Sequence, residues 1–296
     1  MKDFPDLFAE FANAKSSWVR SKTLRGYTDV TGHYWNWIGQ QPQLLDWTHV
    51  ATVENYLANR RRDGLADASL ATVRRTLSVF FNWLVKRQYL DTNPVALTDK
   101  PIIRRKLKTY ITPGEFAQFL SSIPSYSWMD LRDRCLLLIL FFSGLRAGEA
   151  VRLCLNDVDN EQLAITVRNG KGGHDRMVPC TPDLPASLSA YLKARPSWSK
   201  PIIFVSNNGF GGIRGPITAD GVRQMLKRRF AAAHMEYHNI KAFRHSFGTN
   251  FLNAGVRRSS LAEMMGHTDE KITAIYAQHE HRALIREYRL AYEQLK

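Results

Sequence analysis

The sequence predicts a mainly α-helical protein with one small β-hairpin or sheet, divided into two domains. Most of the 296 residues follow the apolar spacing of an amphipathic helix. Residues 160–180 alternate instead and pass through a cluster of glycines, which is typical of a hairpin. Residues 98–113 have prolines near both ends, no apolar period and five basic side chains, which favours a linker.

These patterns predict three segments. We expect a helical domain over residues 1–97, a basic linker over 98–110, and a mixed α+β domain over 111–296. The chain is long enough for two cores of ordinary size.

Four helices are expected in the first domain. Residues 4–16 have apolar side chains at helical spacing, and residues 21–40 repeat the pattern after a possible Ser21 cap. A third helix is expected to start at Thr48 as its N-cap and to end at three arginines followed by Gly64.

The fourth helix has the clearest apolar face. Asn93-Pro94 is expected to stop it, because the residue before a proline disfavours the helical conformation. Arg74 and Arg75 fall beside the apolar face. The face itself is formed by Leu70, Val73, Leu77, Phe80 and Leu84.

The second domain begins with a strongly apolar segment. Residues 136–142, LLLILFF, are too few to cross a bilayer and predict a buried core helix. In the hairpin that follows, Lys171 is flanked by glycines at the tip. The spacing is not that of a P-loop, and no nucleotide-binding fingerprint or metal-ligand set is apparent in the sequence.

Composition narrows the functional class. The chain has 41 Lys+Arg against 27 Asp+Glu, a net charge of +14 and a pI near 9.8, which favours a polyanionic partner such as nucleic acid. Cys135, Cys154 and Cys180 lack metal-ligand spacing and are expected to be free thiols. With an N-terminus unlike a signal peptide, a cytoplasmic protein without membrane contact is expected.

Several short motifs follow one another in the second domain. Arg146 lies in a Gly-Leu-Arg turn with Glu149 three residues later. Arg244 and His245 follow Lys241 near the start of a predicted helix. Residues 266–280, GHTDEKITAIYAQHE, then place His267 and Tyr276 nine positions apart.

Together these motifs resemble the tyrosine recombinase (phage integrase) family, with the size of its Xer members. The order of arginine, hairpin lysine, Arg-His pair, Gly-His and tyrosine carries the resemblance. So do the patterns TLRGY and SLATVRRTLS in the first domain. The resemblance implies a helical core-binding domain, a mixed catalytic domain, and site-specific recombination through a 3′-phosphotyrosyl intermediate and a Holliday junction, without metal, ATP or another cofactor.

The resemblance assigns a role to each motif residue. Tyr276 would be the nucleophile, and Lys171 the general acid. Arg146 and Arg244 would bind the non-bridging phosphate oxygens, because guanidinium forks match phosphate geometry. His267 would hydrogen-bond the phosphate, and Glu149 would orient the first arginine.

One position departs from the family pattern. Lys241 stands where the family usually has histidine, as KAFR in place of His-x-x-Arg. A protonated lysine can donate to phosphate but cannot accept the tyrosine's proton. His238, three residues earlier, is an alternative base, so the identity of the base stays open.

Further contacts are expected with double-stranded DNA and with other subunits. The resemblance implies that residues 281–296 form a helix that docks into a neighbouring subunit, within a homo-tetramer, or a hetero-tetramer with a related recombinase, assembled on DNA. The basic linker suits a strap along a phosphate backbone. The candidate DNA-binding residues are Arg74, Arg75, Arg104, Arg105, Lys106 and Lys108.

Two other functions share part of this pattern. A type IB topoisomerase uses similar chemistry, but the predicted core-binding helices and exchange helix argue against it. A non-catalytic DNA-binding relative is suggested only by Lys241.

Overall fold

A computed structural model describes residues 3–43, 45–103, 110–168 and 175–266. The chain divides into two compact units, Met1–Lys106 and Leu107–Lys296. The expected segments 1–97, 98–110 and 111–296 have similar limits, and their exact boundaries stay predictions.

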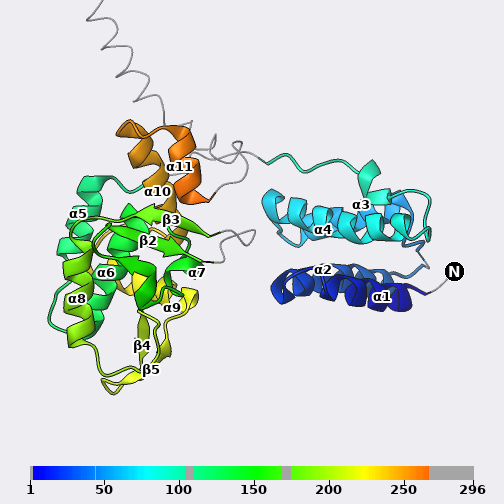
Figure 1. The fold of residues 1–296 in the computed structure, drawn as a ribbon. Helices are drawn as coiled ribbons and strands as arrows, with labels where there is room; N and C mark the ends of the chain where they lie inside the picture. Colours follow the sequence, from blue (N-terminus) through cyan, green and yellow to red (C-terminus); the bar gives the residue numbers. More distant parts are fainter. Residues whose placement is uncertain (1–2, 44, 104–109, 169–174, 267–296) are drawn as a thin grey trace, which may run out of the picture. The chain divides into compact units, whose positions relative to one another are not determined.

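The first unit is helical, as expected (Figure 1). Its core is rich in aromatic side chains: Phe4 stacks on Trp35 with ring centroids 4.4 Å apart, and Phe80 packs against both Phe4 and Phe11. Helices α1 and α2 pack together, and α2 and α3 each pack on α4. The helices are α1 (Phe4–Ser16), α2 (Ser21–Gly39), α3 (Val50–Arg62), α4 (Asp67–Lys86) and the short 3-10 helix η1 (Pro94–Leu97).

The predicted apolar face of α4 is confirmed, since Leu70, Leu77, Phe80 and Leu84 are buried. The predicted end of this helix is wrong. It ends at Lys86, where Gln88 adopts a positive φ of 60° and the Tyr89 N–H donates to the Leu84 carbonyl. Asn93 instead caps η1 by accepting from the Val95 N–H.

Two predicted helix starts differ by one residue. Arg20, and not Ser21, is the N-cap of α2, and His49 takes the place expected for Thr48. His49 accepts from the Ala51 N–H, and the Thr48 hydroxyl and N–H both donate to Asp46.

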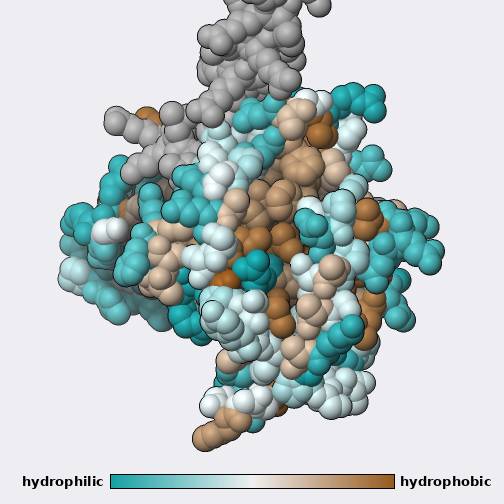
Figure 2. All heavy atoms as spheres, turned by 90° about the vertical axis from the view of Figure 1, so that its left-hand side faces the viewer, coloured by the Kyte–Doolittle hydropathy of each residue, from teal (hydrophilic) through white to brown (hydrophobic). Residues whose placement is uncertain are grey.

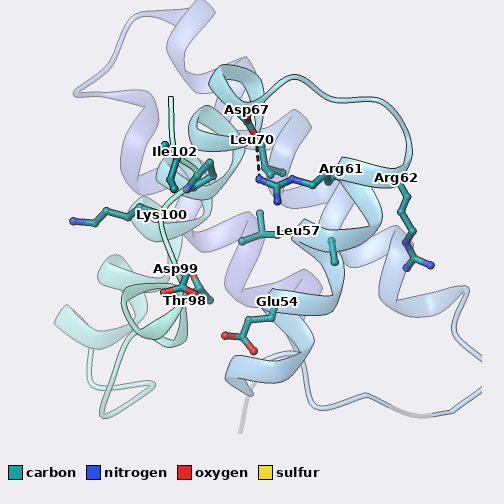
Figure 3. A pocket seen from close by; sticks show the side chains of 12 residues that line it. Glu54, Leu57, Arg61, Arg62, Asp67, Leu70, Thr98, Asp99, Lys100 and Ile102 are labelled. Carbon is teal, nitrogen blue, oxygen red and sulfur yellow. Dashed lines mark hydrogen bonds and ion pairs between the residues drawn. The ribbon is translucent and has the colours of Figure 1, made fainter. Parts of the chain in front are cut away.

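Arg74 ties α4 to the segment after η1. Its Nη2 donates to the Val95 and Thr98 carbonyls at 2.7 and 2.8 Å, and its Nε donates to the Thr98 hydroxyl at 2.8 Å. The same segment forms one wall of a pocket of about 620 Å³ (Figure 3), opposite α3 and the start of α4. In it Arg61 binds Asp67 at 2.9 Å. Of the predicted linker, Thr98 is therefore bound to the helical unit, and residues 98–102 line this pocket.

The second unit surrounds the long apolar helix α6 (Figure 1). Cys135 to Phe141 are all buried, so the predicted core helix is confirmed. The helices are α5 (Pro113–Ser121), α6 (Trp128–Phe142), α7 (Ala147–Ala150), the 3-10 helix η2 (Leu155–Asp157), α8 (Leu184–Ala194), α9 (Ala219–Ala232), α10 (Ile240–Asn253) and α11 (Arg258–Met265).

Polar side chains also enter this core, where they form an ion network between α6 and α9. Arg132 donates to Asp133 through Nε and Nη2 and to the Val205 carbonyl through Nη1. Arg229 of α9 bridges Asp130 and Asp133. Each buried charge thus has a partner, as burial requires.

The predicted hairpin is confirmed in its described strands. β2 (Ala164–Val167) and β3 (Arg176–Pro179) pair antiparallel, with Ile165 opposite Val178, and β1 (Val158–Asp159) extends the sheet. A second hairpin, β4 (Val205–Asn207) and β5 (Ile213–Pro216), was not predicted. β4 has only three residues, and β5 contains Gly215 and Pro216, residue types that are depleted in strands, so neither segment predicts a strand.

The face of the molecule that Figure 2 shows has apolar residues near its centre and hydrophilic residues around them. The three cysteines are free, as predicted. Across the described ranges, no helix combines the length and hydropathy needed to span a membrane.

Candidate active site

The turn after α6 presents Arg146. Gly144 has a φ of +58°, a conformation that glycine adopts without the steric cost of a Cβ. A Cβ at this position would lie 2.3 Å from a ring carbon of Phe247 on α10, so the close approach of α10 also requires glycine. Arg146 follows as the N-cap of α7.

Glu149 binds Arg146 at two points. Its Oε2 accepts from the Arg146 N–H at 2.7 Å, and its Oε1 accepts from Arg146 Nη1 at 2.8 Å. The Glu149 side chain is 4% exposed, whereas that of Arg146 is 29% exposed and can reach a ligand. The orienting role of Glu149 stays a prediction.

A second arginine, Arg176 of β3, holds the other side of Glu149. Its Nη1 and Nη2 donate to the two carboxylate oxygens at 3.1 and 2.8 Å. Burial by itself would raise the pKa of Glu149, but the hydrogen bonds from Arg176 and Arg146 outweigh it and lower the pKa to about 2. Glu149 is therefore an anion throughout the neutral range.

Arg244 enters from α10. Asn239 caps this helix by accepting from the Lys241 and Ala242 N–H groups. One turn later, Arg244 Nη1 donates to the Gly144 carbonyl at 2.6 Å, and its Nη2 donates to the Met265 carbonyl. Arg244 is thus bound to the same turn that presents Arg146.

The three arginines meet at the C-terminal end of α11. Arg176 Nε donates to the Met264 carbonyl at 2.8 Å, Arg244 Nη2 to the Met265 carbonyl, and Arg146 Nη2 to the Gly266 carbonyl at 3.5 Å. The last carbonyls of a helix lack intrahelical partners and carry partial negative charge, which favours cations there. Gly266, at φ 60° and ψ 50°, ends the helix in the left-handed conformation.

The structure therefore brings together three of the predicted site residues, Arg146, Glu149 and Arg244. Lys241 lies exposed on the first turn of α10, one turn before Arg244. The ring of His238 lies against Phe230 of α9, with centroids 5.7 Å apart.

The remaining predicted site residues lie outside the described residues. They are Lys171, His267 and Tyr276, the linker residues Arg104, Arg105, Lys106 and Lys108, and the predicted exchange helix 281–296. In the sequence, His267 follows directly on Gly266, the C-cap of α11. Of the predicted DNA-binding residues, Arg75 is exposed on α4, and Arg74 has the internal contacts given above.

The sequence reasoning missed Arg176. One signal was available: side chains alternate along a strand, so Arg176 shares the face of the buried Val178. A cation on a buried face requires a partner. Within the described ranges, no cluster of three or more His, Cys, Asp or Glu side chains could hold a metal ion.

Comparison with known proteins gives consistent matches. The Phage integrase family matches residues 109–282. Tyrosine recombinase XerA of Thermococcus kodakarensis is 31% identical over 254 residues, which cover 86% of this chain and 83% of the relative. Tyrosine recombinase XerC of Pelotomaculum thermopropionicum is 30% identical over 247 residues, covering 82% and 80%.

Solved structures share the fold at lower identity. The integrase of the transposon Tn1549 in complex with transposon right end DNA is 21% identical, has a TM-score of 0.77, and covers 96% of this chain and 98% of its own. The site-specific recombinase XerH bound to a palindromic difH substrate is 20% identical with a TM-score of 0.73, covering 90% and 79%. The predicted fold class, mainly helical with small antiparallel sheets, is confirmed by these matches and by the structure.

Proposed function

We propose that this chain, which belongs to the phage integrase family and is a tyrosine recombinase, cuts and rejoins a specific double-stranded DNA site through a transient 3′-phosphotyrosyl bond at Tyr276. The observation that carries the proposal is the convergence of Arg146 and Arg244. They come from separate elements and meet at the end of α11, directly before residue 267. Two guanidinium groups so placed are suited to the two non-bridging oxygens of one phosphate.

In this proposal the Tyr276 phenol oxygen attacks the scissile phosphorus, and the bond from phosphorus to the 5′ oxygen breaks. Arg146 and Arg244 stabilise the charge that develops on the phosphate. His267 donates to the phosphate as well. The phosphotyrosyl bond conserves the energy of the phosphodiester, so religation requires no nucleotide cofactor.

The two lysines have different roles, and the proton of the Tyr276 phenol passes to a base, for which neutral Lys241 and His238 are the candidates. Lys171 protonates the leaving 5′ oxygen, because an alkoxide is a poor leaving group. Lys241, at the start of α10, donates to the phosphate from the side of the nucleophile.

Recombination joins two DNA sites, and each site has two halves. Four subunits on DNA therefore complete the reaction through a Holliday junction, with residues 281–296 of one subunit docked on the next. The solved relatives in complex with DNA support the choice of a DNA recombination site as the substrate.

The central experiment traps the covalent intermediate. The substrates are DNA duplexes with a nick beside each candidate cleavage position. They come from two sources: a random library from which this protein selects its binding sites, and the DNA that flanks its gene. Wild type should give a protein–DNA band in a denaturing gel, and Tyr276→Phe should give none. An adduct that persists in Tyr276→Phe would show that the nucleophile is misassigned.

A 5′-bridging phosphorothiolate substrate tests the two lysines. The 5′ sulfur of this substrate leaves as a thiolate and needs no proton. The substrate should therefore restore cleavage by Lys171→Ala but not by Lys241→Ala or Arg146→Ala. Lys241→His should keep appreciable activity on ordinary DNA. Rescue of Lys241→Ala and not of Lys171→Ala would reverse the two roles.

Two activity measurements separate the proposal from its alternatives. Relaxation of supercoiled DNA without paired sites would favour a topoisomerase. Sequence-specific binding without any adduct would favour a non-catalytic relative.

A further inference from the structure

Arg176 is a largely buried cation for which the proposed chemistry has no role. Its side chain is 9% exposed, against 29% for Arg146. With both of its terminal nitrogens on Glu149 and its Nε on Met264, it is directed into the protein. Arg176 is therefore poorly placed to bind DNA itself.

The contacts of Arg176 join two parts of the site. Its fork holds both carboxylate oxygens of Glu149, which in turn holds the backbone and guanidinium of Arg146. It also lies close to Gly266, where an added Cβ would come 3.1 Å from Arg176 Cδ and 3.2 Å from its Nε and Nη1. One side chain thus spans the turn that presents Arg146 and the residue before His267.

The charges of Arg146, Glu149 and Arg176 also affect how strongly Arg146 attracts a phosphate. A single carboxylate, Glu149, lies between two guanidinium groups. With Arg146 alone it would form a neutral pair, which would weaken the attraction of Arg146 for a phosphate. Arg176 balances the carboxylate, so the group of three keeps one net positive charge, and the only member with substantial exposure is Arg146.

We propose that Arg176 is a positioning residue that acts through Glu149. It fixes the orientation of Arg146, preserves its positive charge for the scissile phosphate, and holds that guanidinium in register with the end of α11. This inference rests on the proposed function of the same site. A lysine could not replace Arg176, because a point charge cannot bind both carboxylate oxygens and the Met264 carbonyl in one plane.

The alternative is that Arg176 only stabilises the fold. Arg132 offers a matched control in the same unit, since it is 6% exposed and also binds a carboxylate and a carbonyl, those of Asp133 and Val205. Its contacts lie in the ion network of α6 and α9. Loss of Arg132 should cost stability without a specific effect on phosphate chemistry.

The test compares single-turnover cleavage of two nicked substrates, one with a normal scissile phosphate and one with a methylphosphonate there. The methylphosphonate lacks one negative charge and depends less on the arginines. On normal DNA, Arg176→Gln and Arg176→Lys should cleave at least tenfold more slowly than wild type, with DNA affinity changed by less than about threefold. On the methylphosphonate the deficit should shrink several-fold, as it should for Glu149→Gln.

Two further results are expected. Arg132→Gln should show the same rate ratio to wild type on both substrates, whatever its melting temperature. The double variant Arg176→Gln/Glu149→Gln should be no slower than the slower single variant, because the two residues act in one chain of contacts.

The proposal is overturned if Arg176→Lys cleaves normal DNA at the wild-type rate, or if the Arg176 deficits are equal on both substrates. Arg176→Lys retains the charge and provides the test if Arg176→Gln does not fold. Failure of the proposed function is a separate result: wild type itself would then form no adduct on normal DNA.

Discussion

Arg74 in the first unit and the pair Arg146 and Arg176 in the second unit each join separate segments, but their partners differ. In the first unit, Arg74 donates to two backbone carbonyls and a hydroxyl, and so fastens the segment after η1 to α4. In the second unit, Arg146 and Arg176 share the carboxylate of Glu149, and both also reach carbonyls at the end of α11. Neutral partners suffice to join two segments of a fold. A carboxylate shared between two guanidinium groups also fixes their orientation.

This difference predicts different consequences of losing an arginine. Removing the internally bonded Arg74 should mainly change stability. Removing an arginine of the active-site group should mainly change the rate of cleavage. The following predictions test that distinction, from the largest effect to the smallest.

The largest effect is expected for Arg146→Ala and Arg244→Ala. Each should slow single-turnover cleavage by about 100-fold to 1000-fold, because each variant loses hydrogen bonds that become stronger as negative charge develops on the phosphate. Affinity for the uncleaved site should change little. Cleavage within a factor of a few of the wild-type rate would reject the role of the variant residue.

Gly144→Ala should destabilise the second unit by roughly 3 kcal/mol, from the positive φ and from the clash of a new Cβ with Phe247. Cleavage should fall as well, because the Gly144 carbonyl holds Arg244. The matched control is Gly64→Ala in the first unit, which also has a positive φ but no atom within 4 Å of its Cβ. The control should cost only about 1 kcal/mol in urea unfolding. Equal losses would show that the approach of α10 does not require glycine.

The lowered pKa of Glu149 predicts that the folded protein loses stability in acid. Its pKa is about 2 in the folded protein, below the ordinary value of 4.5, so its contribution to stability is complete above pH 4.5 and disappears as the pH falls towards 2. The contribution is roughly 3 kcal/mol at neutral pH.

Urea unfolding of wild type and Glu149→Gln measures the contribution of the Glu149 carboxylate to stability. The stability gap between them should be widest near pH 7 and should narrow steadily below pH 4.5. A gap that does not depend on pH would mean that the carboxylate is not held as the geometry indicates.

The smallest effect is expected in the first unit. Arg74→Ala should cost about 1–3 kcal/mol of stability, because it removes the guanidinium donor from the Thr98 carbonyl and one of the donors from the Val95 carbonyl. The cleavage rate of the bound complex should stay within about threefold of wild type. Arg75→Ala, at the exposed neighbouring position, should lower DNA affinity at unchanged stability. If Arg74→Ala instead weakens DNA binding without loss of stability, the contrast between the two units fails at this residue.

Local patterns in the sequence predicted much of the fold. The apolar face of α4, the buried α6 and the pairing of β2 with β3 each follow from a periodicity that repeats within one element. The order and spacing of the motif residues also indicated the family. The end of α4 was missed because the αL conformation of Gln88, and not the distant proline, terminates the helix.

The sequence by itself determined which residue types the site could use, and in what order. Only the tertiary structure decided what each arginine touches: Arg146 meets Gly266 across 120 residues, and Arg176 meets Met264 across 88. The physical reason is that capping and periodicity act within a few residues, whereas the partner of a buried guanidinium depends on which carbonyls and carboxylates packing brings near. For that reason Arg176 remained unnoticed in the sequence, although it lies between Glu149 and the end of α11 in the structure.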